Sequence, residues 1–273
     1  MLLPIVLSLT TALPAQDPSP FAALRQRFER AYDAKDAAAC TALWKEAGEL
    51  VLPLIDADLE GSLKLCETSA SPDLARVKAM RARAIWGAGL ASDVTGSPLL
   101  ADYAAAFAGW TPEQAASFRA GQKAYREAGA LLKKGDARAA LDQAESCALL
   151  ASNLGDWWGA AMGHEARGRA LQSLARLGEA LDAWSTARWI QHGLGLASDE
   201  LDSVHHVADL CFAEARNERG LVAARQGVAL AKALGAKGEL AALLEREAQL
   251  EERLGDAEGA KATRKELEAA KAK

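Results

Sequence analysis

The second half of the sequence repeats itself at a constant step of forty residues, and this repeat limits what the chain can fold into. The pair Leu-Gly occurs at 154–155, 194–195 and 234–235. Small residues recur at the same step in two series: Ala128, Gly168, Ala208 and Ala248, and then Ala140, Ala180, Gly220 and Ala260. Short side chains let two helices approach closely, so each repeat is predicted to be a pair of helices joined by a tight turn. Because one pair cannot bury its apolar face alone, successive pairs are expected to stack.

The residues between these positions favour helix. Ala, Leu, Glu, Arg and Lys dominate, and no segment alternates apolar and polar residues over the length of a strand. Pro53 is expected to kink or break the helix that begins near Asp36. Helix starts are predicted where a capping Ser or Thr precedes a Pro. These pairs are Ser19-Pro20, Ser71-Pro72, Ser97-Pro98 and Thr111-Pro112, the last with Gln114 in a capping-box pattern.

The repeat resembles the tetratricopeptide repeat (TPR) from about residue 113 to residue 270. The TPR pattern has a small residue on the first helix, Gly-Asp at the turn, and Ala and aromatic residues on the second helix. The four units match it with Ala128, Gly135-Asp136, Ala140, Ala144 and Cys147; with Gly168, Ala180, Trp184 and Ala187; with Ala208, Gly220, Ala224 and Gly227; and with Ala248, Gly255-Asp256 and Ala260. The resemblance implies an all-α fold, a right-handed α-solenoid of antiparallel helical hairpins.

The chain departs from the family in three ways. Its period is forty residues rather than the usual length of about 34. The early Trp of the motif is missing, with His164 in its place in the second unit, and the closing Pro is absent. These departures concern the curvature of the solenoid rather than the helical hairpins.

The sequence divides into three regions. Residues 1–15 carry no charged side chain and include an apolar run of signal-peptide length, with small residues before a polar segment. We expect a cleaved export signal and a periplasmic or secreted protein; an uncleaved anchor or a buried helix are the alternatives. Residues 16–112 are predicted to form about two divergent helical pairs, and residues 113–273 four TPR-like hairpins with a polar C-terminal cap. No later segment is apolar enough to span a membrane.

Several classes of function lack a signal in the sequence. The net charge is -5 and there is no long basic run, so nucleic acid is not an expected partner. No HExxH motif, paired histidines at helical spacing or Cys-His spacing predicts a metal site. No GxSxG, Walker or GxGxxG motif predicts a catalytic site or a cofactor, and none is expected. The four cysteines are read as small core residues, with a Cys40–Cys66 disulfide as the alternative.

In the TPR family, first-helix side chains line a concave groove, which binds partners. Carried over to this sequence, the positions include Gln122, Met162 and Ala242, together with the candidate binding residues Tyr125, Glu165, Arg169, Gln172, Asp202, His205, Asp209, Phe212, Glu245 and Gln249. Carboxylates outnumber the single Arg, so the groove is expected to hold a basic or amine-bearing segment of a protein or peptide, with Tyr125 and Phe212 in apolar contact. The alternative is a solvated helix face.

The expected function is that of an exported, non-enzymatic scaffold or adaptor. An accessory subunit that senses a small ligand, and a helical enzyme with an unrecognised site, are the alternatives. An enzyme would show a pocket with two or more titratable side chains of shifted pKa. Adjacent Trp157 and Trp158 cannot both point inward, so one is expected to be partly exposed, either packing between repeats or anchoring a ligand.

Overall fold

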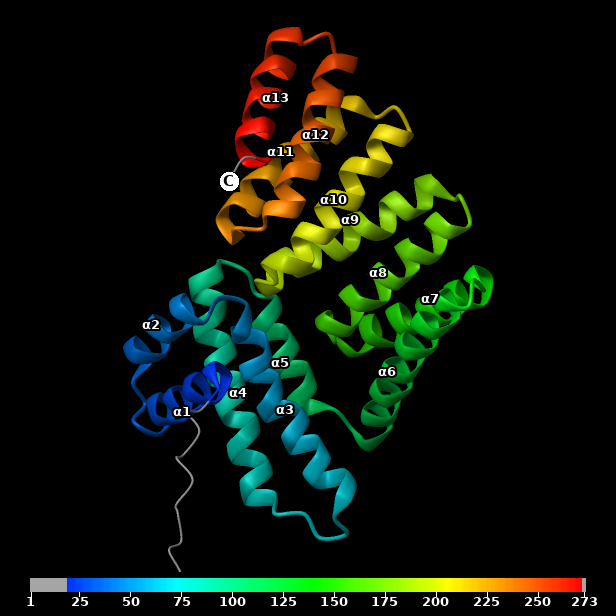
Figure 1. Ribbon diagram of the computed structural model, residues 1–273. Helices are drawn as coiled ribbons and strands as arrows, with labels where there is room; N and C mark the ends of the chain where they lie inside the picture. Colours follow the sequence, from blue (N-terminus) through cyan, green and yellow to red (C-terminus); the bar gives the residue numbers. More distant parts are fainter. Residues whose placement is uncertain (1–18, 272–273) are drawn as a thin grey trace, which may run out of the picture.

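The computed structural model describes residues 19–271, and all the regular structure in that range is helical (Figure 1). The N-terminal helices are α1 (Pro20–Asp33), α2 (Ala37–Ala47), the 3-10 turn η1 (Gly48–Leu50), α3 (Val51–Thr68), α4 (Leu74–Thr95) and α5 (Leu99–Gly109). The repeat contains α6 (Pro112–Lys133), α7 (Ala137–Leu154), α8 (Trp157–Ser173), α9 (Leu177–Leu194), α10 (Ala197–Ala213), α11 (Asn217–Leu234), α12 (Lys237–Arg253) and α13 (Ala257–Lys271). The chain is an all-α solenoid, as predicted.

The forty-residue step sets the ends of the helices. The second helices of the four hairpins, α7, α9, α11 and α13, begin at residues 137, 177, 217 and 257. The Leu-Gly pairs end three of them, because Gly155, Gly195 and Gly235 adopt positive φ values of 68°, 73° and 67°. Only glycine reaches this backbone conformation without strain, so it stops each helix at the same place.

The recurring small residues lie where the helices meet. Ala128, Ala208 and Ala248 are at most 2% exposed, and Gly168 is also buried. A Cβ atom added at Gly168 would lie 2.6 Å from the indole nitrogen of Trp184 on the partner helix. These contacts confirm that the repeated small positions are helix-packing positions.

Two of the four predicted Ser/Thr-Pro helix starts are confirmed. Ser19 caps α1, and Thr111 forms a complete capping box at the start of α6. The predictions at the other two pairs are wrong by one or two residues: α4 begins after Asp73, whose carboxylate accepts the N–H of Arg76, and α5 begins after Pro98. Asp73, two residues after Ser71, is also a good helix cap, and the Ser/Thr-Pro pattern does not take such a competing cap into account.

The break predicted near Pro53 is present, but glycine makes it. α2 ends at Gly48, which has a φ of 54°, and the chain restarts through η1. Pro53 then falls in the first turn of α3, where its missing N–H costs little.

The N-terminal helices pack against the side of the repeat (Figure 1). Leu99 on α5 shares one core with Ile190 and Leu194 at the end of α9. The indole N–H of Trp110 donates to the carbonyl of Leu154 at 3.0 Å, and Ser198 at the start of α10 donates to the Glu49 carboxylate. These contacts hold α5 and η1 against the ends of α7 and α9 and the start of α10.

Three further predictions concern the signal peptide, membrane-spanning segments and the cysteines. The predicted signal peptide, residues 1–15, lies outside the described residues. Within residues 19–271 no helix is long and apolar enough to cross a membrane. All four cysteines are free thiols, so the alternative Cys40–Cys66 disulfide is not formed.

Candidate functional site

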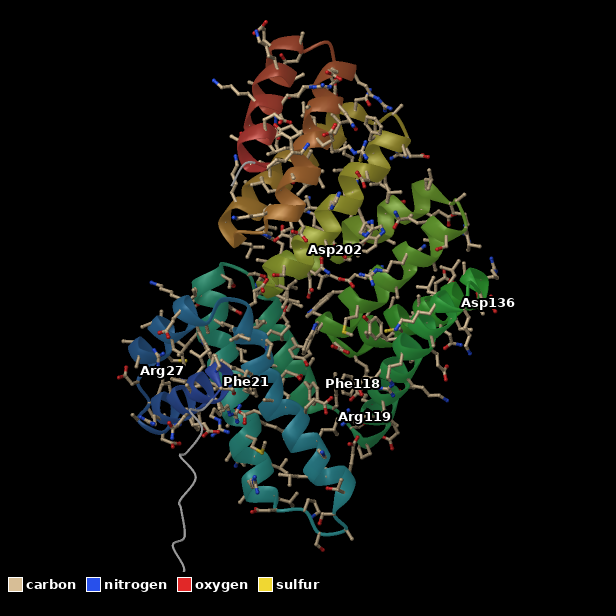
Figure 2. All side chains as sticks on the ribbon, viewed as in Figure 1. Phe21, Arg27, Phe118, Arg119, Asp136 and Asp202 are labelled. Carbon is tan, nitrogen blue, oxygen red and sulfur yellow. The ribbon has the colours of Figure 1, made fainter. Side chains whose placement is uncertain are left out.

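The predicted groove residues lie on the first helices of the hairpins, and ion pairs connect some of them to the next hairpin. Asp202, labelled in Figure 2, is one of these residues. Arg169 on α8 lies 3.2 Å from the Asp202 carboxylate on α10. Arg246 on α12 lies 2.7 Å from the Asp209 carboxylate, also on α10. Three of the predicted carboxylates, Asp202, Asp209 and Glu165, therefore already have arginine partners within the chain.

Phe212 does not offer the predicted apolar contact. The guanidinium groups of Arg246 and Arg253 lie 4.1 Å and 3.2 Å from the centre of its ring. Two cations over one ring occupy its π faces, so Phe212 stabilises the packing of α10 against α12. Nearby Gln249 accepts from Arg246 and donates to Glu245, so both residues belong to the same surface network.

Three further predicted residues have partners inside the protein. Gln172 accepts the indole N–H of Trp184 at 2.7 Å, and Glu165 accepts the amide of Gln191 at 2.5 Å. Burial raises the pKa of Glu165 to about 7. His205 lies 3.7 Å from Asp209, within its own helix. Gln172 and Glu165 are therefore held by hydrogen bonds within the chain, whereas the neighbour of His205 is on its own helix.

Two hollows lie along this face, and the predicted positions contribute to both. The first, called here the N-terminal cavity, has a volume of about 390 Å³ and is enclosed by α3, α5, α6, α7 and the start of α8. It is lined by the predicted positions Gln122, Tyr125 and Met162. The second, called here the open hollow, measures about 550 Å³ and is lined by the predicted positions Asp202, His205 and Ala242, together with Glu49 and Glu239.

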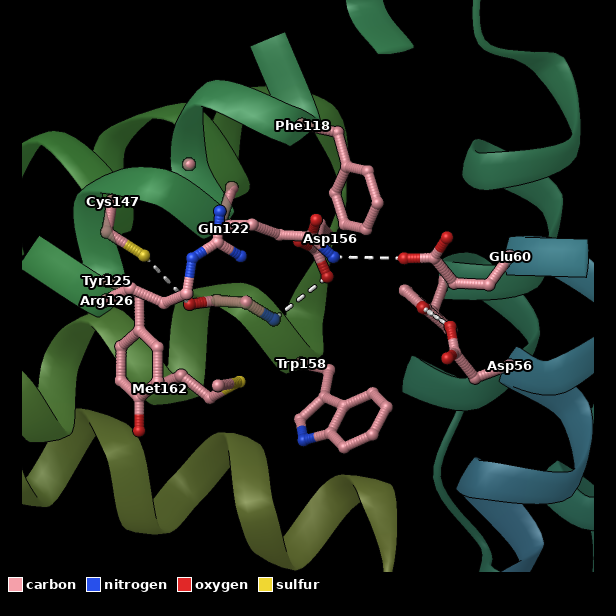
Figure 3. Close-up of a pocket in the computed structure, with 14 residues that line it drawn as sticks. Asp56, Glu60, Phe118, Gln122, Tyr125, Arg126, Cys147, Asp156, Trp158 and Met162 are labelled. Atoms are coloured by element: carbon pink, nitrogen blue, oxygen red, sulfur yellow. Dashed lines mark hydrogen bonds between the residues drawn. The ribbon is translucent and has the colours of Figure 1, made fainter. Parts of the chain in front are cut away.

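The N-terminal cavity has aromatic walls (Figure 3). Phe118 and Tyr125 come from α6, and Trp158 comes from the first turn of α8. Both Trp157 and Trp158 are partly exposed, and they separate in role: Trp157 packs edge-on against Trp189, while Trp158 lines the cavity. Packing and ligand-anchoring were alternatives for this pair, and the structure places only Trp158 where it can contact a ligand.

Two carboxylates of the N-terminal cavity are largely desolvated. Burial raises the pKa of Asp56 to about 7, although the hydroxyl of Tyr103 donates to it at 2.5 Å and opposes the shift. Burial also raises the pKa of Asp156 to about 6, and this side chain is only 5% exposed. Asp156 caps α8 by accepting the N–H of Gly159 at 2.9 Å. Within residues 19–271, neither carboxylate forms an ion pair.

The other charged groups of the cavity are already paired or exposed. Glu60 accepts from Arg119 at 2.8 Å and from Gln122 at 2.9 Å. Arg126 lies at the rim and is exposed to solvent. Burial raises the pKa of the Cys147 thiol to about 11, so it stays protonated and is a weak nucleophile. Among the described residues, no three His, Cys, Asp or Glu side chains converge closely enough to hold a metal ion.

Asp56, Tyr103 and Asp156 line the cavity but were not predicted from the sequence. Asp56 and Tyr103 belong to helices outside the clear repeat, and nothing in the repeat pattern shows that these helices lie over α6 and α8. Asp156 follows a helix-ending Gly155, which identifies it as a cap rather than as a ligand-binding group. An acidic residue inside the apolar run LVLPLIDADLE was the available signal for a buried polar site.

Comparisons with known proteins add little to this geometry. No protein-family model matches the chain, and no curated protein sequence matches it. Among solved structures, the crystal structure of BtubC (BKLC) from P. vanneervenii is similar, with a TM-score of 0.48 and 13% identity, covering 92% of this chain and 89% of that chain. A likeness at this level carries no argument about function, so the candidate site depends on its own geometry.

Proposed function

We propose that this chain is an exported, non-enzymatic scaffold or adaptor of the TPR type, and that it binds a basic segment of a protein or peptide along the first-helix face of its solenoid. The observation that carries the proposal is that family groove positions line both hollows on this face. The uncharged, apolar N-terminus of the sequence supports export, and the repeated small residues support the family.

The charges of the open hollow favour a cationic partner. Glu49, Asp202 and Glu239 line it, and no Lys or Arg of the described chain does so. Arg169 offsets the charge of Asp202, but Glu239 is exposed and forms no ion pair with the described residues. A basic segment placed here gains charge complementarity, which favours fast and selective association more than high affinity.

The test compares two soluble peptides of equal length, one of alternating Lys and Ser and one of alternating Glu and Ser. Calorimetry is expected to detect binding of the basic peptide alone, with an affinity that weakens as salt is added. Glu239→Lys is expected to weaken it roughly tenfold, because the substitution reverses a charge in the hollow. Asp209 and Glu165 are less suitable for charge reversal, because Asp209 is paired with Arg246 and Glu165 is largely buried.

Glu218→Lys is the matched control. Like Glu239, Glu218 is an exposed acidic residue in the first turn of a helix, but it lies on α11 outside both hollows. Equal loss of binding in the two variants would show that only the net charge matters and would contradict the groove. Binding of the acidic peptide, or unchanged binding by the Glu239 variant, would contradict the proposal as well.

An enzyme is the second candidate, because the N-terminal cavity holds two titratable carboxylates with raised pKa. Asp56 and Asp156 have the protonation behaviour that general acid or base catalysis uses. The weakly acidic Cys147 thiol gives this candidate no activated nucleophile. Mass spectrometry of ligands recovered after incubation separates the two: unchanged ligand supports binding, and a converted ligand supports an enzyme.

A further inference from the structure

The N-terminal cavity has the size of a small-ligand site. Its volume of about 390 Å³ is at the low end of the range for such sites, roughly 300–1,000 Å³. At about 30 Å³ for each water-sized group, it has room for about a dozen non-hydrogen atoms. The N-terminal helices close one side of it, so a ligand would be held between two parts of the chain (Figure 3).

The lining combines apolar walls with three carboxylates and one cation, Arg126, which is exposed to solvent. Phe118, Tyr125 and Trp158 offer aromatic surface, and Met162 adds an adaptable apolar side chain. An ammonium group is attracted both to aromatic faces and to carboxylates. Asp56 and Asp156 supply carboxylates that lack a cationic partner within the described chain, whereas Glu60 is already paired with Arg119.

The buried carboxylates of Asp56 and Asp156 can still accept hydrogen bonds and an ion pair from a ligand. Asp156 is 5% exposed, and its one hydrogen bond is the cap to Gly159, so most of its acceptor capacity is unused. Burial raises the pKa of both Asp56 and Asp156, so a cation placed beside them would stabilise their charged forms.

We propose that the N-terminal cavity binds an alkylammonium group, with Asp56 and Asp156 as its counter-ions and Trp158 and Phe118 against its carbon chain. The ammonium group comes either from a lysine side chain of a bound segment or from a free small amine. The lysine source rests on the proposed function, because it requires a basic segment in the groove. The free-amine source does not.

The first experiment measures binding of cadaverine to the full chain at about pH 8, by calorimetry and by tryptophan fluorescence. The control ligand is 1,5-pentanediol, which has the same carbon chain without the charges. Cadaverine is expected to bind and to change the tryptophan emission, with the change absent in Trp158→Phe, and the diol is expected not to bind. No binding of cadaverine, or equal binding of the diol, would overturn the inference.

Two conservative variants test the counter-ions. Asp156→Asn removes the charge but retains a side chain that caps helices well, and Asp56→Asn retains an acceptor for Tyr103. Each is expected to weaken cadaverine binding about tenfold or more. Asp136→Asn is the matched control, because Asp136 caps α7 by accepting the N–H of Ala139 and lies outside the cavity. Equal affinity in all variants would overturn the assignment, with circular dichroism confirming that each is folded.

Two further comparisons distinguish a lysine side chain from a free amine, and amine binding in the cavity from peptide binding in the groove. If the Lys peptide binds more tightly than its Arg equivalent, and Asp156→Asn removes this preference, the ammonium group belongs to lysine. If Asp156→Asn weakens cadaverine binding but leaves peptide binding unchanged, the ammonium group belongs to a free amine. Glu239→Lys is expected to weaken the basic peptide but not cadaverine. Peptide binding without cadaverine binding would overturn this inference and leave the proposed function standing.

Discussion

Asp58 is a buried carboxylate of the N-terminal helices that two arginines hold from neighbouring helices. Its side chain is fully buried in α3, with the Arg83 guanidinium at 2.6 and 2.7 Å and the Arg25 guanidinium in contact as well. Asp58→Ala leaves both cations without this partner, so the free energy of unfolding is expected to fall by about 3–5 kcal/mol, as for other broken buried pairs. Urea unfolding measures it.

The control for this prediction is an exposed ion pair of the same helical bundle. Glu46 and Arg27 form a bidentate pair on the surface. Because solvent screens such a pair, Glu46→Ala is expected to leave stability nearly unchanged. A similar loss in both variants would mean that burial does not set the importance of Asp58.

Asp56 is expected to make stability depend on pH. Its pKa is raised to about 7 in the folded protein, mainly by burial, whereas an unfolded Asp titrates near about 3.9. Between these values the folded state holds a proton that the unfolded state has lost, so stability falls as the pH rises from about 4 to about 7. Glu60 and Asp156 raise this pKa further, while Tyr103 and Arg119 lower it.

Asp56→Asn removes this titration. Relative to the unchanged protein, the variant is expected to gain about 1.4 kcal/mol of stability for each pH unit between about 5 and the folded pKa of about 7, which is about 3 kcal/mol between about pH 5 and about pH 8. Chemical unfolding at the two pH values measures the difference. Asp102→Asn, an exposed Asp on α5, is the control and is expected to show no such pH dependence. A flat difference for Asp56→Asn would contradict the raised pKa.

At the scale of elements, the turns inside the hairpins are built alike but not from the same residues. Gly135 and Gly255 begin two of them with positive φ, and an Asp then caps the next helix. Ala175 and Ala215 occupy the equivalent places with a φ of 55°. Because Cβ strains this conformation, Ala215→Gly is expected to stabilise the protein by about 1 kcal/mol, measured by thermal or urea unfolding.

The same substitution two residues earlier provides the control. Ala213 is exposed and ends α10 in helical conformation, so Ala213→Gly is expected to destabilise by up to about 1 kcal/mol. Loss of stability in both variants would show that Ala215 is not strained.

The sequence predicted elements better than it predicted the site. The recurring Leu-Gly pairs predicted where helices end, because Gly155 and its equivalents must adopt positive φ. The groove register was also informative, since Tyr125 and Asp202 do line hollows. The arginine partners of the acidic groove residues were not anticipated, because pairing across hairpins depends on the distance between helices. Asp56 and Tyr103 were missed because packing between distant segments leaves no periodic trace in one sequence.

The whole molecule depends on the contact between the N-terminal helices and the repeat. The N-terminal cavity takes Asp56 and Tyr103 from the former and Trp158 from the latter, so it exists only when the two parts are docked. Gly193, near the end of α9, lies at this contact: an added Cβ would be 2.5 Å from a methyl carbon of Leu99 on α5. A methyl group here tests the docking without altering any cavity residue.

Gly193→Ala is expected to destabilise the protein by about 1–3 kcal/mol through overpacking, and also to weaken cadaverine binding by shifting α5. Adding Leu99→Ala makes room for the methyl group, so the two changes are expected to be less harmful together than the sum of their separate effects. Gly129→Ala is the control, since a Cβ there meets no neighbour within 4 Å. If Gly193→Ala lowers stability but leaves cadaverine binding unchanged, the cavity does not depend on the contact between α9 and α5. The added methyl group would then be accommodated by movement of α9, and α5 would keep its position.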